Sequence, residues 1–157
     1  LQAMKTNAQP PRIRLLLVEG DHDSFARIIL MLEEIAPRQF TLEWAATYGF
    51  AVSLLRRSHF DLCLANARLG HRTGIELITE MRALACHTPV LLLADAEEME
   101  LFGQPIAPAC DCLDRSRLSA EMLRQAIRET VGRSATNLPC FAPRAGRAAA
   151  DSKPVIA

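Results

Sequence analysis

Polar side chains that could do chemistry follow two apolar runs of this sequence. The turn after the first run contains Glu19, Asp21 and Asp23, and Asn66 follows the apolar run at 60–64. Asn66 carries an amide where a carboxylate would be the more reactive group, so the first question is what an amide does there.

The surrounding chain alternates between strand and helix patterns. Aliphatic runs bounded by turn residues predict strands buried on both faces of a parallel sheet, and apolar residues at helical spacing predict helices between them. Five strand–helix repeats predict one doubly wound α/β domain. The expected strands are 13–18, 40–47, 60–64, 90–94 and 110–113, and the expected helices are 24–36, 48–58, 74–84, 95–102 and 116–132.

Such a sheet would gather the polar residues at one edge, because ligands bind beyond the carboxyl ends of parallel strands. His22 and His71 flank the same edge, so a metal site of His, Asp and Glu could form there. Solvated turn residues are the preferred interpretation, since the spacing matches no ligand motif. Trp44, the only tryptophan, is expected away from this edge.

Composition limits the possible partners. The 157 residues contain 18 Lys plus Arg and 18 Asp plus Glu, so no global positive field attracts nucleic acid or an anionic membrane. No apolar run approaches the roughly 20 residues that span a bilayer, and we expect a cytoplasmic protein without a signal peptide. The five cysteines are interpreted as reduced thiols. A zinc site at Cys110 and Cys112 would lack a second ligand pair.

The ends of the chain differ from its centre in composition. Residues 1–11 are polar and close on two prolines, which predicts a disordered lead-in or a remnant of expression. Residues 12–133 form the predicted domain. The segment 134–157, rich in Ala, Pro and Arg, is expected to be a linker or tail. At 24 residues it is too short for a helix-turn-helix, which disfavours a DNA-binding regulator unless the chain is a fragment.

Four strings in the right order resemble the receiver domain of bacterial response regulators. They are LLLVEGD, FDLCLANARLGHRTGIEL, TPVLLLAD and ACDCLDRSRLSAEMLRQAIR, between residues 15 and 128. The last string is most similar to receivers found beside cyclic-di-GMP-synthesising or sensor domains. The resemblance implies a flavodoxin-like fold with strand order 2-1-3-4-5.

In that family, the resemblance implies, a carboxylate takes up a phosphoryl group beside two acidic Mg²⁺ ligands, a hydroxyl, a lysine and a switch aromatic. This chain departs from the pattern at five positions. The phosphoacceptor position is Asn66, and an amide is not a usable nucleophile for phosphate at neutral pH. The acidic pair becomes Glu19 and Gly20, with Asp21 nearby, and the remaining positions are Ala94, Arg115 and Cys112.

These departures predict a degenerate pseudo-receiver with weak or absent magnesium binding, no cofactor and no enzymatic activity. Arg115 is expected to form an ion pair with Glu19 or Asp21 across the strand ends. Asn66 either mimics one state of the switch or reflects drift after phosphorylation was lost. The alternative is a phospho-accepting, Mg²⁺-dependent receiver, or a small hydrolase, that uses Asp21, Asp23 or His22.

The segment after the fourth strand departs from the helical pattern. Gly103, Pro105 and Pro108 predict a short or broken fourth helix. In receivers, the resemblance implies, the surface of the fourth helix, fifth strand and fifth helix binds partners. Phe102, Ile106 and Met122 are therefore interface candidates, for a homodimer or for a partner such as a histidine kinase or a cyclic-di-GMP enzyme. The alternative is that this segment folds back over the core.

Overall fold

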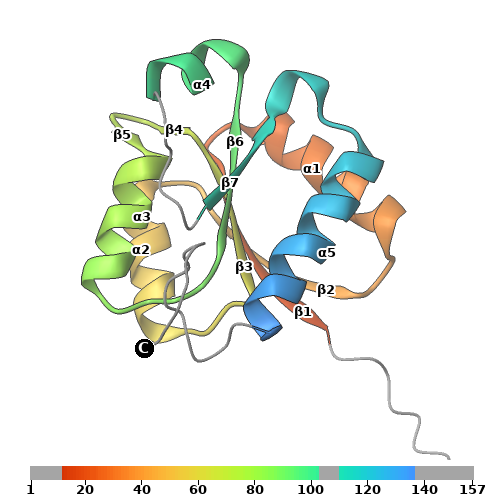
Figure 1. The fold of residues 1–157 in the computed structure, drawn as a ribbon, viewed down its shortest axis with the longest axis horizontal. Coiled ribbons are helices and arrows are strands. Elements are labelled where there is room, and N and C mark those ends of the chain that lie inside the picture. The colour runs from red at the N-terminus through yellow and green to blue at the C-terminus, as the bar shows by residue number, and fades with distance from the viewer. Residues whose placement is uncertain (1–11, 103–109, 137–157) are drawn as a thin grey trace, which may run out of the picture.

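The centre of the protein is a parallel sheet of five strands (Figure 1). A computed structural model describes residues 12–102 and 110–136. The strands are β1 (Ile13–Val18), β2 (Phe40–Ala45), β3 (Leu62–Asn66), β6 (Val90–Ala94) and β7 (Cys110–Asp114), in the order β2-β1-β3-β6-β7. This order confirms the predicted doubly wound α/β fold.

Helices cover both faces of the sheet. Alternate residues of β1 point to opposite faces: Leu16 and Val18 pack with the helices at 48–57 and 74–83, whereas Leu15 and Leu17 pack with those at 22–35 and 120–136. All four side chains are fully buried, which explains why β1 reads as a continuous aliphatic run. The helices are α1 (His22–Ile35), α2 (Tyr48–Arg57), α3 (Gly74–Ala83), α4 (Ala96–Phe102) and α5 (Ala120–Thr136).

The predicted lead-in at 1–11 and most of the predicted tail lie outside the described residues. The helix α5 extends to Thr136, beyond the predicted end at residue 132. None of the helices in the two described ranges is long and apolar enough to span a bilayer.

The first helix begins earlier than its apolar pattern predicted. It starts at His22 rather than at residue 24, because Asp21 caps it: the Asp21 carboxylate accepts a hydrogen bond of 2.8 Å from the Ser24 amide. The predicted acidic turn is therefore largely the first turn of α1.

The third strand lies two residues later than predicted. β3 covers Leu62–Asn66, so Asn66 is its last residue rather than a residue beyond it. The strand starts after Asp61 because two hydrogen bonds join this residue to the backbone of Arg14, near the start of β1. The Asp61 carboxylate accepts from the Arg14 amide, and the Asp61 amide donates to the Arg14 carbonyl oxygen. Phe60, which precedes the strand, is buried in the core, with 1% of its surface exposed.

The last helix begins later than predicted. A 3₁₀ turn, η1 (Arg115–Arg117), follows β7, and α5 starts only at Ala120. Asp114 causes this turn, because its carboxylate accepts hydrogen bonds from the Ser116 amide (3.0 Å) and hydroxyl (2.6 Å).

The loop after β3 contains a small antiparallel hairpin that the sequence analysis did not predict. Its strands are β4 (Arg68–Leu69) and β5 (Arg72–Thr73), and Gly70 supplies the positive φ of the turn, +72°. The Arg72 guanidinium lies 4.0 Å from the centre of the Tyr48 ring and donates to its hydroxyl, which attaches the hairpin to α2.

Gly74 generates a prediction for stability. A Cβ there would lie 2.4 Å from the Leu92 Cδ2 and 3.0 Å from the Asn66 carbonyl oxygen. We expect Gly74→Ala to lower the free energy of unfolding by ~1–3 kcal/mol, through strain where α3 meets the sheet. Urea unfolding followed by circular dichroism measures it. Gly49→Ala in α2 is the control, because nothing lies within 4 Å of its Cβ position. Equal effects of the two substitutions would contradict the close approach at Gly74.

Candidate functional site

Four predicted site residues lie at the carboxyl edge of the sheet. Glu19 follows β1, Asn66 ends β3, Ala94 ends β6 and Arg115 follows β7. The parallel register places these ends at one level: Val18 pairs with Ala65, Asn66 with Leu93, and Ala94 with Asp114. Three of the four, all except Ala94, are joined by hydrogen bonds.

The Asn66 amide uses both its donor and its acceptor. Its Nδ2 donates to Glu19 Oε1 at 3.3 Å, and its Oδ1 accepts from the Ala67 amide at 3.1 Å and from the Arg115 guanidinium. A carboxylate at this position could only accept hydrogen bonds, and it would stand against the carboxylate of Glu19. The amide therefore joins an anion on one side to a cation on the other.

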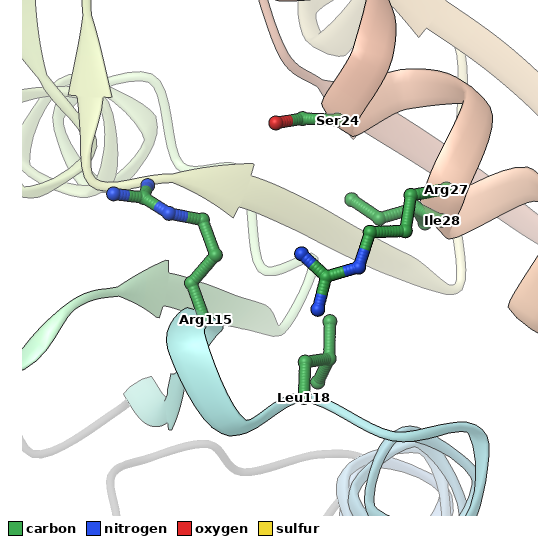
Figure 2. A pocket seen from close by; sticks show the side chains of 5 residues that line it. All are labelled: Ser24, Arg27, Ile28, Arg115 and Leu118. Carbon is green, nitrogen blue, oxygen red and sulfur yellow. The ribbon is translucent and has the colours of Figure 1, made fainter.

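Arg115 pairs with different acids from those predicted. Its guanidinium lies 3.3 Å from the Asp95 carboxylate and 3.2 Å from that of Glu98, whereas Glu19 or Asp21 was expected. The reason is that Asn66 stands between Arg115 and Glu19. Figure 2 shows the Arg115 side chain reaching from η1 toward the end of the sheet, while the Arg27 guanidinium lies over Leu118. The small cavity beside them, about 10 Å³, has room for one water at most.

Glu98 is a central member of the site that the sequence analysis missed. Its side chain is 4% exposed; Oε1 accepts from the Asp95 amide (3.0 Å) and from Arg115, and Oε2 accepts from Arg68 Nε (2.8 Å). Asp95 in turn accepts from the Glu98 amide at 2.8 Å. This is a capping box at the start of α4, and the spacing of Asp95 and Glu98 could have predicted it.

Glu19 is buried in the middle of the site, at 2% exposure. Its Oε1 accepts from Asn66 and from the Asp21 amide, at 3.0 Å, whereas its Oε2 has no hydrogen-bond partner among the described residues. Burial raises the pKa of Glu19 above its usual value, although the Asp21 amide and the charge of Arg115 act in the opposite direction.

The donors at this edge do not fit the magnesium site that the family resemblance implies. Glu19 is the buried carboxylate that follows β1, and Gly20 beside it offers no side chain; a Cβ there would lie 3.2 Å from the Ala46 carbonyl oxygen. Asp21 caps α1, and its bond to Ser24 lowers its pKa. Asn66 Oδ1 is bonded to Arg115. Within residues 12–102 and 110–136, no group of three or more His, Cys, Asp or Glu could hold a metal.

At the hydroxyl and switch-aromatic positions that the family resemblance implies, this chain has Ala94 and Cys112, which carry neither a hydroxyl group nor an aromatic ring. Ala94 is fully buried and its methyl group forms no hydrogen bond. Cys112 is half-buried against the core on the α2–α3 side, and burial raises the pKa of its thiol, so it stays protonated at neutral pH.

Two residues near the site differ from expectation. Trp44 was expected away from this edge, but its indole Nε1 donates to the Glu19 carbonyl oxygen at 2.7 Å. Its fluorescence is therefore a local reporter of the turn after β1. The His22 ring packs edge-on against Trp44, with ring centres 5.1 Å apart, as part of the α1 surface.

Among the interface candidates, Met122 on α5 is 37% exposed. The nearby helix α4 exposes 65% of Leu101, which the sequence analysis did not single out. The side chain of Phe102 and the whole of Ile106 lie outside the described part of the chain.

Comparison with known proteins identifies the family and agrees with the fold. The family model of the response regulator receiver domain matches residues 15–128. No curated protein matches the chain.

Among solved structures, the chain is similar to the receiver domain of a sensor histidine kinase from Pseudomonas aeruginosa PAO1, solved with a magnesium ion in its active-site cleft. The TM-score is 0.66 at 22% identity, over 77% of this chain and 98% of that one. It is also similar to a CheY-like receiver from Methanospirillum hungatei JF-1, with a TM-score of 0.65 and 20% identity over 80% and 98% of the chains. At this identity the likeness shows the fold.

The buried Glu19 generates a prediction for pH dependence. Because its pKa is raised in the folded state, Glu19 stabilises the fold when protonated, and this contribution is lost as pH rises through the folded pKa. We expect the stability of the wild type relative to Glu19→Gln to fall as the pH rises above about 4.5, the ordinary pKa of a glutamate, and through the raised pKa of the folded state. Urea unfolding of both proteins at several pH values measures this.

A comparison with Asp21→Asn provides a control of opposite sign. The pKa of Asp21 is lowered, so its contribution is present above the unfolded pKa and is lost as pH falls. A stability difference between wild type and Glu19→Gln that stays constant or grows with pH would contradict the raised pKa of Glu19.

Proposed function

We propose that this chain, which belongs to the response regulator receiver domain family, is a pseudo-receiver that works without phosphorylation. It acts by protein–protein contact in a bacterial two-component or cyclic-di-GMP pathway, and not as an enzyme. The observation that carries this proposal is the amide of Asn66 at the end of β3, hydrogen-bonded to Glu19 on one side and to Arg115 on the other.

The chemistry of the amide supports the proposal directly. Phosphoryl transfer to a side chain requires a nucleophilic atom with an available lone pair, such as a carboxylate oxygen. The amide nitrogen lone pair is delocalised into its carbonyl group, and its Nδ2 hydrogen bond points to Glu19. Asn66 therefore offers no phosphoacceptor.

The charges at the site support it as well. A transferring phosphoryl group needs cations that are free to neutralise it. The Arg115 guanidinium is already neutralised by Asp95 and Glu98, and Ala94 has no hydroxyl to donate. Glu19 has no second carboxylate beside it at position 20, and Glu98 is paired with Arg68 and Arg115, so magnesium binding is proposed to be weak or absent.

The partner is proposed to be another signalling protein, such as a histidine kinase or a cyclic-di-GMP enzyme, or a second copy of this chain. The proposed contact face consists of α4, β7 and α5. Leu101 and Met122 support this choice, because they are large apolar side chains exposed on α4 and α5. The zero net charge is consistent with a protein partner rather than a nucleic acid.

A second candidate is a receiver that still accepts phosphate through a displaced acid. Asp21 favours this candidate, because its carboxylate is exposed near Glu19 and its pKa is lowered, so it is ionised at neutral pH. Against it, that carboxylate is engaged in the cap of α1.

The two candidates predict different responses to a phosphate analogue. We expect Mg²⁺ with beryllofluoride to leave the Trp44 fluorescence and the backbone amide shifts of the wild type unchanged, because no carboxylate is positioned to take the analogue. Titration with the analogue in large molar excess over the protein tests this. Acetyl phosphate, followed by intact mass, tests for transfer of a phosphoryl group.

The control is Asp21→Ala in the same titration. A saturable wild-type response that Asp21→Ala abolishes would establish the displaced-acid receiver and overturn the pseudo-receiver. A saturable response that survives Asp21→Ala would also overturn it.

The proposed homodimer has its own test. We expect the wild type to sediment as a dimer at about 100 μM and Met122→Glu to weaken the dimer at least tenfold, because a charge would be buried in the interface. Analytical ultracentrifugation measures both. Leu30→Glu, on the exposed side of α1 at 70% exposure, is the control and should leave the dimer intact. A monomeric wild type would rule out the homodimer and leave a different protein as partner.

A further inference from the structure

A continuous chain of hydrogen bonds and ion pairs runs along the carboxyl edge of the sheet. Trp44 of β2 donates to the Glu19 carbonyl after β1, and the Glu19 carboxylate accepts from Asn66 of β3. Asn66 accepts from Arg115 after β7, and Arg115 donates to Glu98 and Asp95 after β6. The end of each of the five strands contributes a group to this chain.

Its last members form an ion triad of Arg68, Glu98 and Arg115. Each carboxylate oxygen of Glu98 has its own arginine: Oε1 accepts from Arg115 at 3.2 Å and Oε2 from Arg68 at 2.8 Å. The three residues come from three separate elements, namely the β4–β5 hairpin, α4 and η1. Their side chains are 61%, 4% and 24% exposed, so the carboxylate is buried and the arginines reach it from outside.

This triad is the main polar attachment of α4. The helix has only seven residues, which is too short to be stable by itself. The buried Glu98 lies in its first turn and connects it to the hairpin on one side and to η1 on the other. A buried carboxylate without its cations would be strongly unfavourable, so the position of α4 depends on both arginines.

We infer that Glu98 is the positioning residue of α4, and that Arg68 and Arg115 hold this helix in one place without any ligand. The inference rests on the proposed function and gives it a mechanism. The Arg115 guanidinium binds Asn66, Asp95 and Glu98 at the strand ends. The orientation of α4 is therefore permanent and is not set by an added phosphate or metal ion. A partner that contacts α4 would then always meet the same surface.

Hydrogen exchange of the α4 amides tests this inference. Glu98→Gln keeps the shape of the side chain and its role in the capping box, where Gln is also accepted, but removes the charge. We expect exchange of the amides at 98–101 to accelerate about tenfold or more, because charge-assisted hydrogen bonds to both arginines are weakened. Amides of β1 should keep their wild-type rates, which shows that the fold is intact.

Glu97→Gln is the matched control, because it makes the same chemical change at the neighbouring, exposed residue of the same helix. It should leave the exchange of α4 within about twofold of the wild type. Arg115→Met and Arg68→Met should each accelerate α4 exchange as Glu98→Gln does. Combining either with Glu98→Gln should add less than the sum of the single effects, because the residues act as one unit.

The outcomes separate this inference from the proposed function. Glu98→Gln and Glu97→Gln with equal α4 exchange, or fully additive effects in the double variants, would overturn the positioning role while leaving the pseudo-receiver untouched. If beryllofluoride changes the amide exchange of α4 in the wild type, the claim that α4 is positioned without a ligand is overturned. A wild type without such a change, together with faster α4 exchange in Glu98→Gln but not in Glu97→Gln, supports both.

Discussion

The structure at the carboxyl edge depends on one constraint: carboxylates removed from water must be matched by donors within the protein. Glu19 and Glu98 are 2% and 3% exposed, and burial of an unmatched carboxylate would cost several kcal/mol (about 3–5 when one partner of a buried pair is lost). Arg68 and Arg115 supply charge to Glu98, and the Asn66 amide supplies a hydrogen bond to Glu19. Nearly every polar group of the site is engaged in meeting this requirement.

The same constraint explains why several residues of the site differ together from those that the family resemblance implies. With an amide at Asn66, the carboxylate of Glu19 faces a donor rather than another anion. With arginine at 115, one side chain is long enough to reach Asn66, Asp95 and Glu98 together. The side chains of Asn66 and Arg115 therefore bind each other and the neighbouring carboxylates, so the site forms one connected network. One atom remains unmatched, Glu19 Oε2, and the raised pKa of that residue is its electrostatic consequence.

Within the proposed function, the site residues of a pseudo-receiver have a structural role. In a phosphate-accepting receiver, the family resemblance implies, a phosphoryl group is bound at the strand ends. Under the pseudo-receiver proposal, the corresponding contacts in this chain come from its own residues and form without a ligand. Within the proposed function, regulation would then depend on the concentration or modification of the partner rather than on the state of this pocket.

The sequence by itself determined the architecture and the chemical types at the site. Aliphatic runs such as Leu15–Val18 are strands because only a sheet covered on both faces buries such a run completely, and their order carried the family resemblance. The same reasoning placed Asn66 and Glu19 at one edge, since parallel strands end together, and the family resemblance added Arg115. Local pattern also located β6 to the residue, because turn residues bound it on both sides.

Only the tertiary structure decided which of these groups touch. Arg115 pairs with Asp95 and Glu98 instead of Glu19 or Asp21, because Asn66 occupies the space between, and a sequence does not contain that distance. The role of Glu98 emerged in the same way: its spacing from Asp95 signals a helix cap, but its burial between two arginines arises from elements 30 and 17 residues away. Ion pairs over such separations depend on packing, whereas strands and helices depend largely on local pattern.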